Sequence, residues 1–161
     1  MTNINQKNIT PCLWFAHQAE EAANFYVSVF KNSKIGSITH YGKEGFEVHG
    51  QKEGTVLTVA FKINGQDFMA FNAGPIFKFN EAVSFQVFCE NQEEIDYYWN
   101  KFTSDGGEES QCGWLKDKFG LSWQIVPNIL QELMSDPKKS GRVMNALLQM
   151  KKFDIEKLIK A

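Results

Sequence analysis

The 161-residue sequence has few cysteines, and it has no long apolar run. Its three cysteines, Cys12, Cys89 and Cys112, form an odd set without a CxxC spacing, which is typical of reduced thiols rather than of a disulfide framework. No window approaches the roughly 20 apolar residues that span a bilayer, and the polar stretch at residues 1–8 lacks the apolar core of a signal peptide. We therefore expect a cytoplasmic protein with no membrane contact.

An excess of charge of either sign is also missing. The chain has 17 Lys and Arg against 19 Asp and Glu, a net charge of −2 with histidine neutral. A chain without a basic field does not attract a polyanion, so we expect no nucleic-acid partner. Aromatic residues are plentiful instead, and phenylalanine alone occurs 14 times. Much of this aromatic surface must be buried or must line a cavity.

An internal repeat is the most informative feature that is present. Residues 19–26 and residues 92–99 both contain two acidic residues, an apolar residue and then an aromatic pair. A short apolar run precedes each copy, and the same offset aligns Pro11 with Ser84. Acidic residues in the first turn and apolar residues at helical spacing predict a helix in each copy. The chain therefore contains two copies of one unit, which consists of a strand, a helix and further strands.

The repeat also predicts the organisation of the chain. We expect module one at about residues 9–73, module two at about residues 82–127, and a helical tail at residues 128–161 without a counterpart in the first half. The Gly74-Pro75 break and the aromatic loop after it connect the modules. Two such units can enclose a hollow that neither forms alone, and function is expected there.

Three segments resemble one known family. They are PCLWF at residues 11–15, GPIFKFNE at residues 74–81 and QCGWLKDKFGLSWQIVP at residues 111–127. Together they resemble the PhnB-like branch of the vicinal oxygen chelate superfamily, which includes glyoxalase I, extradiol dioxygenases and antibiotic resistance proteins. The resemblance covers about residues 9–152.

The resemblance implies an α+β fold of tandem βαβββ modules, whose curved mixed sheets form a cleft, with a C-terminal helical extension. Residues 1–161 would then form a single glyoxalase-like domain within a homodimer. The branch often carries a demethylubiquinone methyltransferase name. The sequence has no glycine-rich turn after a strand that could hold S-adenosylmethionine, so we do not expect that activity.

Metal-using relatives place ligands on the first and last strands of each module. The resemblance maps these positions to Pro11, Met69, Ser84 and Gln124. A catalytic divalent metal needs about three nitrogen, oxygen or sulfur ligands, which Ser84 and Gln124 do not provide. We therefore expect no metal and no cofactor. The alternative is a divalent-metal-dependent isomerase, lyase or oxygenase of the glyoxalase type, which uses Gln124 and ligands elsewhere. The three histidines are expected in solvated loops: His17, His40 and His49.

Strand alternation extends the prediction, because side chains two residues apart share a face. If Ser84 faces the cleft, Gln86 and Phe88 do so too, and the same rule places Leu13 and Phe15 in the cleft wall of module one. An apolar wall facing an amide-bearing wall suits a small, partly hydrophobic organic molecule. In the other interpretation the two glutamines bond each other and a buried water. The expected ligand-binding residues are Leu13, Phe15, Met69, Phe79, Ser84, Gln86, Trp114 and Gln124.

Other notable residues have simpler expected roles. Cys12 and Cys89 are expected as small core residues, and Trp14 as a core residue on the strand face opposite Leu13. The Asp117 carboxylate is expected to cap backbone amides in a turn rather than to act as an acid or base. Trp114 either covers the cleft or packs on its sheet. The aromatic loop between the modules is expected to form a lid or a dimer contact. The sequence does not assign a catalytic residue.

Overall fold

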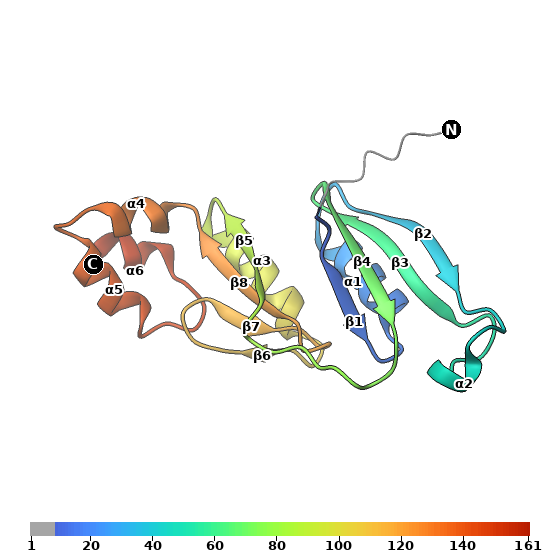
Figure 1. Cartoon of the computed structure of the whole chain (residues 1–161). Coiled ribbons are helices and arrows are strands. Elements are labelled where there is room, and N and C mark those ends of the chain that lie inside the picture. The colour runs from blue at the N-terminus through green and yellow to red at the C-terminus, as the bar shows by residue number, and fades with distance from the viewer. Residues whose placement is uncertain (1–8) are drawn as a thin grey trace. The chain divides into compact units, whose positions relative to one another are not determined.

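The computed structural model describes residues 9–161. The segment at residues 1–8, for which the sequence predicts no signal peptide, lies outside the described residues. In the part of the chain that is described, every helix is too short or too polar to cross a membrane. The chain divides into two compact units after Lys78, and each unit has its own sheet (Figure 1).

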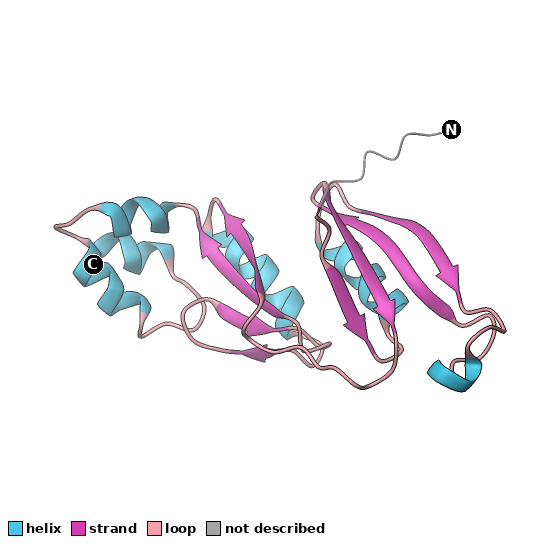
Figure 2. Ribbon diagram, viewed as in Figure 1, coloured by secondary structure: helices cyan, strands magenta, loops and turns pink. Residues whose placement is uncertain are grey.

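The described part of the first unit, residues 9–78, contains four strands and two helices. Its sheet has the strand order β1-β4-β3-β2, with β1 parallel to β4 and the other pairs antiparallel (Figure 2). The Asn64-Gly65 turn joins β3 to β4 as a hairpin, with both residues at the positive φ that a two-residue hairpin turn requires. The elements are β1 (Cys12–Phe15), α1 (Ala19–Val29), β2 (Lys34–His40), α2 (Phe46–His49), β3 (Val56–Ile63) and β4 (Gln66–Asn72).

Helix α1 covers one face of this sheet. Its buried side chains recur at helical spacing, and among them Tyr26 stacks on Phe61 of β3 with ring centroids 6.1 Å apart. The Asn72 side chain of β4 accepts a hydrogen bond of 2.8 Å from the Ala19 amide, so it provides the N-terminal cap that Gln18 does not. Within residues 9–78, no helix packs on the opposite face of the sheet. In each unit, the sheet face opposite α1 or its counterpart is called here the open face.

The second unit repeats this arrangement. Its sheet has the order β5-β8-β7-β6, again with the first pair parallel and the others antiparallel, and α3 packs on one face. The predicted tandem modules are therefore confirmed. The Asn91 side chain caps α3 by accepting a hydrogen bond of 2.9 Å from the Glu94 amide. The repeated elements are β5 (Ser84–Cys89), α3 (Gln92–Thr103), β6 (Glu108–Glu109), β7 (Trp114–Lys116) and β8 (Ser122–Pro127).

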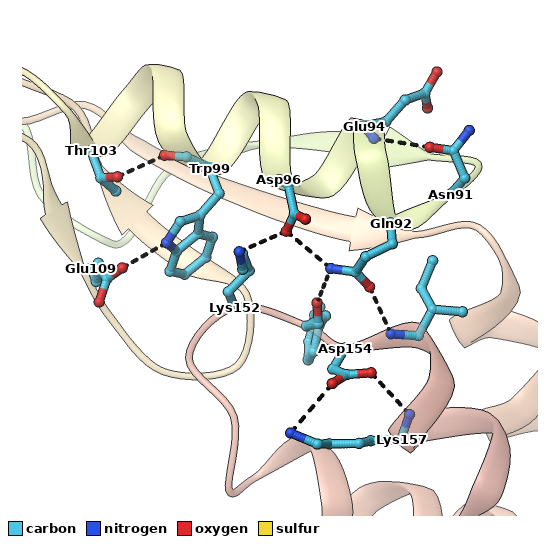
Figure 3. A network of polar contacts seen from close by, with 12 residues as sticks. Asn91, Gln92, Glu94, Asp96, Trp99, Thr103, Glu109, Lys152, Asp154 and Lys157 are labelled. Carbon is cyan, nitrogen blue, oxygen red and sulfur yellow. Dashed lines mark hydrogen bonds and ion pairs between the residues drawn. The ribbon is translucent and has the colours of Figure 1, made fainter.

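The tail forms three helices on the second unit: α4 (Ile129–Ser135), α5 (Ser140–Leu147) and α6 (Ile155–Lys160). The backbone between α5 and α6 pairs with the turn before β7. The Cys112 amide donates to the Met150 carbonyl and the Gly113 amide to the Lys151 carbonyl, both at 2.7 Å. A polar cluster around Gln92 holds the same segment (Figure 3).

The two units differ by one residue in the loop after their first strand. The Ala73 amide donates to the Phe15 carbonyl, and the Asn128 amide donates in the same way to the Cys89 carbonyl, so Phe15 and Cys89 are equivalent. Residues 16–18 then lead to α1, whereas only residues 90–91 lead to α3. The sequence repeat aligns the helices but misaligns the first strands by one residue.

This shift corrects three predictions, because a slip of one residue moves every side chain to the other face. Leu13 and Phe15 are 6% and 3% exposed and lie under α1, not on the open face. Cys12 is exposed, not a core residue. Trp14 lies opposite Leu13 as predicted, but on the open face and partly buried rather than in the core.

Candidate functional site

A row of hydrogen-bonded polar side chains crosses the open face of the second unit. Gln86 of β5 and Gln124 of β8 are neighbours in register, and Gln86 Nε2 donates to Gln124 Oε1 at 3.2 Å. Gln124 Nε2 donates in turn to Ser84 Oγ at 2.8 Å. Gln86 and Phe88 are exposed while the intervening Val87 is buried, so the predicted alternation of β5 is confirmed.

The direction of these bonds decides what the row can still bind. The side-chain carbonyl of Gln124 accepts from Gln86, and one N–H of its side-chain amide donates to Ser84. Within residues 9–161, no acceptor takes the proton of the Ser84 hydroxyl, and no donor reaches the side-chain carbonyl oxygen of Gln86. The row therefore ends in a donor at Ser84 and an acceptor at Gln86.

A small pocket lies at the β7 side of the same face. It has a volume of about 150 Å³ and is lined by Trp114, Lys116, Ser122 and acidic side chains that include Glu81. Ser122 is completely buried, and among the described residues its Oγ has no hydrogen-bond partner. A buried hydroxyl without a partner is costly, so this atom is a point where a water or a ligand group would be stabilised.

An ion pair borders this pocket. Lys116 Nζ lies 2.5 Å from Glu81 Oε1. The hydrogen bond from Lys116 lowers the pKa of the Glu81 carboxyl, and the same bond raises the pKa of the Lys116 ammonium. Both groups are thus held in their charged forms. Neither is suited to exchange a proton near neutral pH.

An apolar groove lies at the other end of the row. It has a volume of about 300 Å³ and lies between the strand ends and α4. Its lining is mostly apolar, and Asn128 and Gln131 are its polar members: the apolar ones are Phe88, Val126, Pro127, Leu130 and Met134. Phe88 of β5 and Val126 of β8 are neighbours in register. The open face of the second unit therefore changes from polar to apolar along its strands.

The open face of the first unit is apolar throughout its centre. It presents Cys12 beside Met69 and Trp14 beside Phe71, in register. Trp14 Nε1 donates to the Gly74 carbonyl at 2.8 Å, and its ring makes edge contacts with Phe71 and with Phe77 of the connecting loop. Met69 thus lies on the expected face, whereas Trp14 takes the place predicted for Leu13 and Phe15.

The donor set does not fit a catalytic divalent metal. Cys12 and Met69 are the first-unit equivalents of Gln86 and Gln124, so the central pair of the first sheet offers a thiol and a thioether, and that of the second sheet offers two neutral amides. Desolvation raises the pKa of the Cys12 thiol, which disfavours the thiolate that a metal requires. Across residues 9–161, no three His, Cys, Asp or Glu side chains cluster as a metal site would require.

The structure bears on the predicted role of one further residue, Asp117. Asp117 is 2% exposed, and its carboxylate accepts hydrogen bonds from the Phe119 and Leu121 amides and from Trp123 Nε1. The turn interpretation of Asp117 is thereby confirmed. Phe79 of the connecting loop is partly buried.

The sequence of this chain matches a known family. The sequence model of the 3-demethylubiquinone-9 3-methyltransferase family matches residues 7–126, well over half of the chain. The chain belongs to this family. It is a PhnB-like member of the vicinal oxygen chelate superfamily, as the resemblance of its motifs implies. No curated protein matches the chain.

Solved structures agree with this family. A PhnB protein from Bacillus cereus is 39% identical to this PhnB-like chain, and the match covers 75% of the chain and 99% of that protein with a TM-score of 0.66. PA1353 from Pseudomonas aeruginosa is 16% identical over 76% of this chain and 98% of its own, with a TM-score of 0.58. The fosfomycin resistance protein FosX from Listeria monocytogenes is 12% identical over 83% of this chain and 100% of its own, with a TM-score of 0.56. The last two likenesses show the fold alone.

Sequence reasoning about this PhnB-like chain missed two features of the open face. The burial of Ser122 follows from its position on β8 between β5 and β7, and strand alternation puts Ser122 on the same face as Gln124. The groove beside α4 had a detectable signal, since Leu130 and Met134 are four residues apart and share a helix face.

Proposed function

We propose that this chain binds a small, partly hydrophobic organic molecule on the open face of its second sheet, without a metal ion. The observation that carries the proposal is the Ser84, Gln124 and Gln86 row, which ends in a donor and an acceptor. A ligand with an acceptor and a donor of its own, such as an amide or a hydroxyketone, complements both ends.

The surroundings of the row support binding rather than a purely structural role. Gln86 and Gln124 bond each other, which the alternative of a purely structural polar core also predicts. In a purely structural core, however, both amides would be buried. Gln86 is exposed, and the adjacent Phe88 is 59% exposed. Trp114 is the in-register neighbour of Gln124 on β7 and adds an aromatic surface beside the row.

The glyoxalase-type alternative, a divalent-metal-dependent isomerase, lyase or oxygenase, is tested by metal content. The two neutral amides of Gln86 and Gln124 on the second sheet favour metal-free binding there. Elemental analysis of protein purified without chelator is expected to give far less than one metal per chain. Stoichiometric metal that a Gln124→Leu variant loses would instead support the enzyme. The cleft between the modules, the homodimer and the cytoplasmic location stay predictions.

Native mass spectrometry of protein taken directly from cells tests the binding proposal. We expect a retained organic compound in the native chain and at least a tenfold lower occupancy in Gln124→Leu. The matched control is Gln111→Leu, which makes the same chemical change at an exposed glutamine outside the row. Equal occupancy in both variants would show that the row does not hold the ligand.

A further inference from the structure

We infer that the ligand carries an unbranched alkyl or phenyl arm, and that this arm lies in the groove between the ends of β5 and β8 and helix α4. The inference rests on the proposed function, because the polar row supplies the other half of the site. It assigns a shape to the ligand: a hydrogen-bonding head and an apolar arm joined end to end.

The groove continues directly from the polar row. Phe88 and Val126 follow Gln86 and Gln124 by two residues on the same strands, so all four side chains share one face. Two strand residues span about 7 Å, which is the distance of a few carbon atoms along a chain. A molecule whose head is bound by the row therefore reaches the groove without crossing polar surface.

Helix α4 forms the far wall of the groove. Leu130 and Met134 are one helical turn apart and line the groove, while Leu133 is buried and holds the helix to the unit. The chain enters α4 directly after β8, through Asn128. In the first unit a loop and not a helix follows β4, so the groove belongs to the second unit alone.

The size and chemistry of the groove select its occupant. A volume of about 300 Å³ lies at the low end of small-molecule sites, so it suits one arm of a ligand rather than a whole cofactor. Apolar cavities do not stabilise water, and methionine adapts to apolar groups of different shape. Five of the seven residues that line the groove are apolar, so an alkyl or phenyl arm fits these walls better than a polar one does.

A series of primary amides provides the probes: acetamide, butanamide, hexanamide and octanamide. Titration of 15N-labelled protein would follow the side-chain NH₂ signals of Gln86 and Gln124. Burial of each methylene in the groove is expected to increase affinity by about fourfold until the groove is filled. The head is the same in all four probes, so acetamide tests the row and the slope with chain length tests the groove.

The variant Met134→Ser tests the position of the arm, and Glu132→Gln is the control because Glu132 is exposed on the same helix. We expect Met134→Ser to bind acetamide as the native chain does and to lose at least tenfold in octanamide affinity. Glu132→Gln is expected to match the native chain for both probes. Met134 is only partly buried, and a thermal melt of each variant checks that its fold is intact.

The possible outcomes separate this inference from the proposed function. If no amide binds, the proposed function fails and the inference fails with it. If all four amides bind equally, the row binds ligands but the groove does not. A length dependence that Met134→Ser leaves unchanged would place the arm elsewhere. A smaller particle mass of Met134→Ser in sedimentation would show that a second copy covers the groove, which would also overturn the inference.

Discussion

Replacement of Gln92 by alanine should release the tail from the second unit. Gln92 lies in the first turn of α3, and both ends of its amide are used (Figure 3). Its Nε2 donates to Asp96 Oδ1 at 3.1 Å and to the Phe153 carbonyl at 3.0 Å, and its Oε1 accepts from the Ile155 amide at 3.0 Å. One side chain therefore fixes the backbone on both sides of Asp154, where α6 begins.

The size of the effect follows from these three hydrogen bonds. A net contribution of about 1 kcal/mol for each bond gives a loss of about 3 kcal/mol in the free energy of unfolding. The Phe153 carbonyl and the Ile155 amide are part-buried, so they would not regain all of their bonds from water. For a chain of this length, about 3 kcal/mol lowers the melting temperature by about 6–12 °C.

The variant Gln92→Glu separates the loss of donors from the loss of packing. The glutamate keeps an acceptor for the Ile155 amide, but places an oxygen opposite the Asp96 carboxylate and the Phe153 carbonyl. It should be at least as unstable as Gln92→Ala at pH 7, and should recover as pH falls toward about 5, because protonation restores one donor.

The native chain should not show this recovery. A hydrogen bond from Lys152 and a second from Gln92 lower the pKa of Asp96. A carboxyl with a lowered pKa in the folded state stabilises the fold above its unfolded pKa, and this stabilisation is lost as pH falls through the folded value. The native chain therefore gains nothing between pH 7 and pH 5, where Gln92→Glu recovers.

Urea unfolding followed by tryptophan fluorescence measures these differences. Asn100→Ala is the control, because Asn100 is exposed on the same helix and its change should stay within about 0.5 kcal/mol. A Gln92→Ala variant as stable as this control would refute the reasoning, since the tail would then be held by its apolar contacts alone.

Three further predictions follow from single residues. Ser122→Ala should leave stability unchanged or raise it by about 1 kcal/mol in urea unfolding, because the hydroxyl is buried without a partner; a clear loss would mean that the native hydroxyl is satisfied. Gly113→Ala should cost about 2–4 kcal/mol, since Gly113 has a φ of +79° and a Cβ there would meet the Phe153 ring at 2.5 Å; a normal melt would contradict this geometry. Burial and the nearby Glu94 raise the pKa of Cys89 to about 12. A maleimide at pH 7.5 should therefore label Cys12 well before Cys89 in the native protein, and should label both in urea, as measured by peptide mass spectrometry. Equal labelling rates in the native protein would argue against the burial of Cys89.

The repeat predicted the fold because helix amphipathicity and strand alternation are both local signals. The helical pattern at residues 19–26 and 92–99 located α1 and α3, and the alternation of β5 was predicted correctly. The short elements were missed for physical reasons. Strand β6 consists of Glu108–Glu109 and has no apolar alternation. Helix α2 spans Phe46–His49 between two glycines at positive φ, and a single turn has no periodicity to detect.

The faces of β1 could not be obtained from the repeat, because a helix alignment does not fix the phase of the strand before it. The length of the connecting loop sets that phase, and the two loops differ by one residue. Alignment of Pro11 with Ser84 therefore placed Leu13 and Phe15 on the wrong face. The direction of the hydrogen bonds in the glutamine row depends on side-chain rotamers, and no sequence pattern contains that information.

The corrected alignment shows where the two halves have diverged. Cys12 and Met69 are equivalent to Gln86 and Gln124, so the same pair of sheet positions carries sulfur in one unit and amides in the other. Sulfur groups are weak hydrogen-bonding partners, whereas a paired amide row has a fixed direction. Directional recognition of a ligand is therefore expected from β5 and β8, where hydrogen bonds select among molecules more sharply than apolar contact does. The first unit has the same strand register with sulfur-containing side chains at these positions, so its open face offers apolar contact but few directional hydrogen bonds.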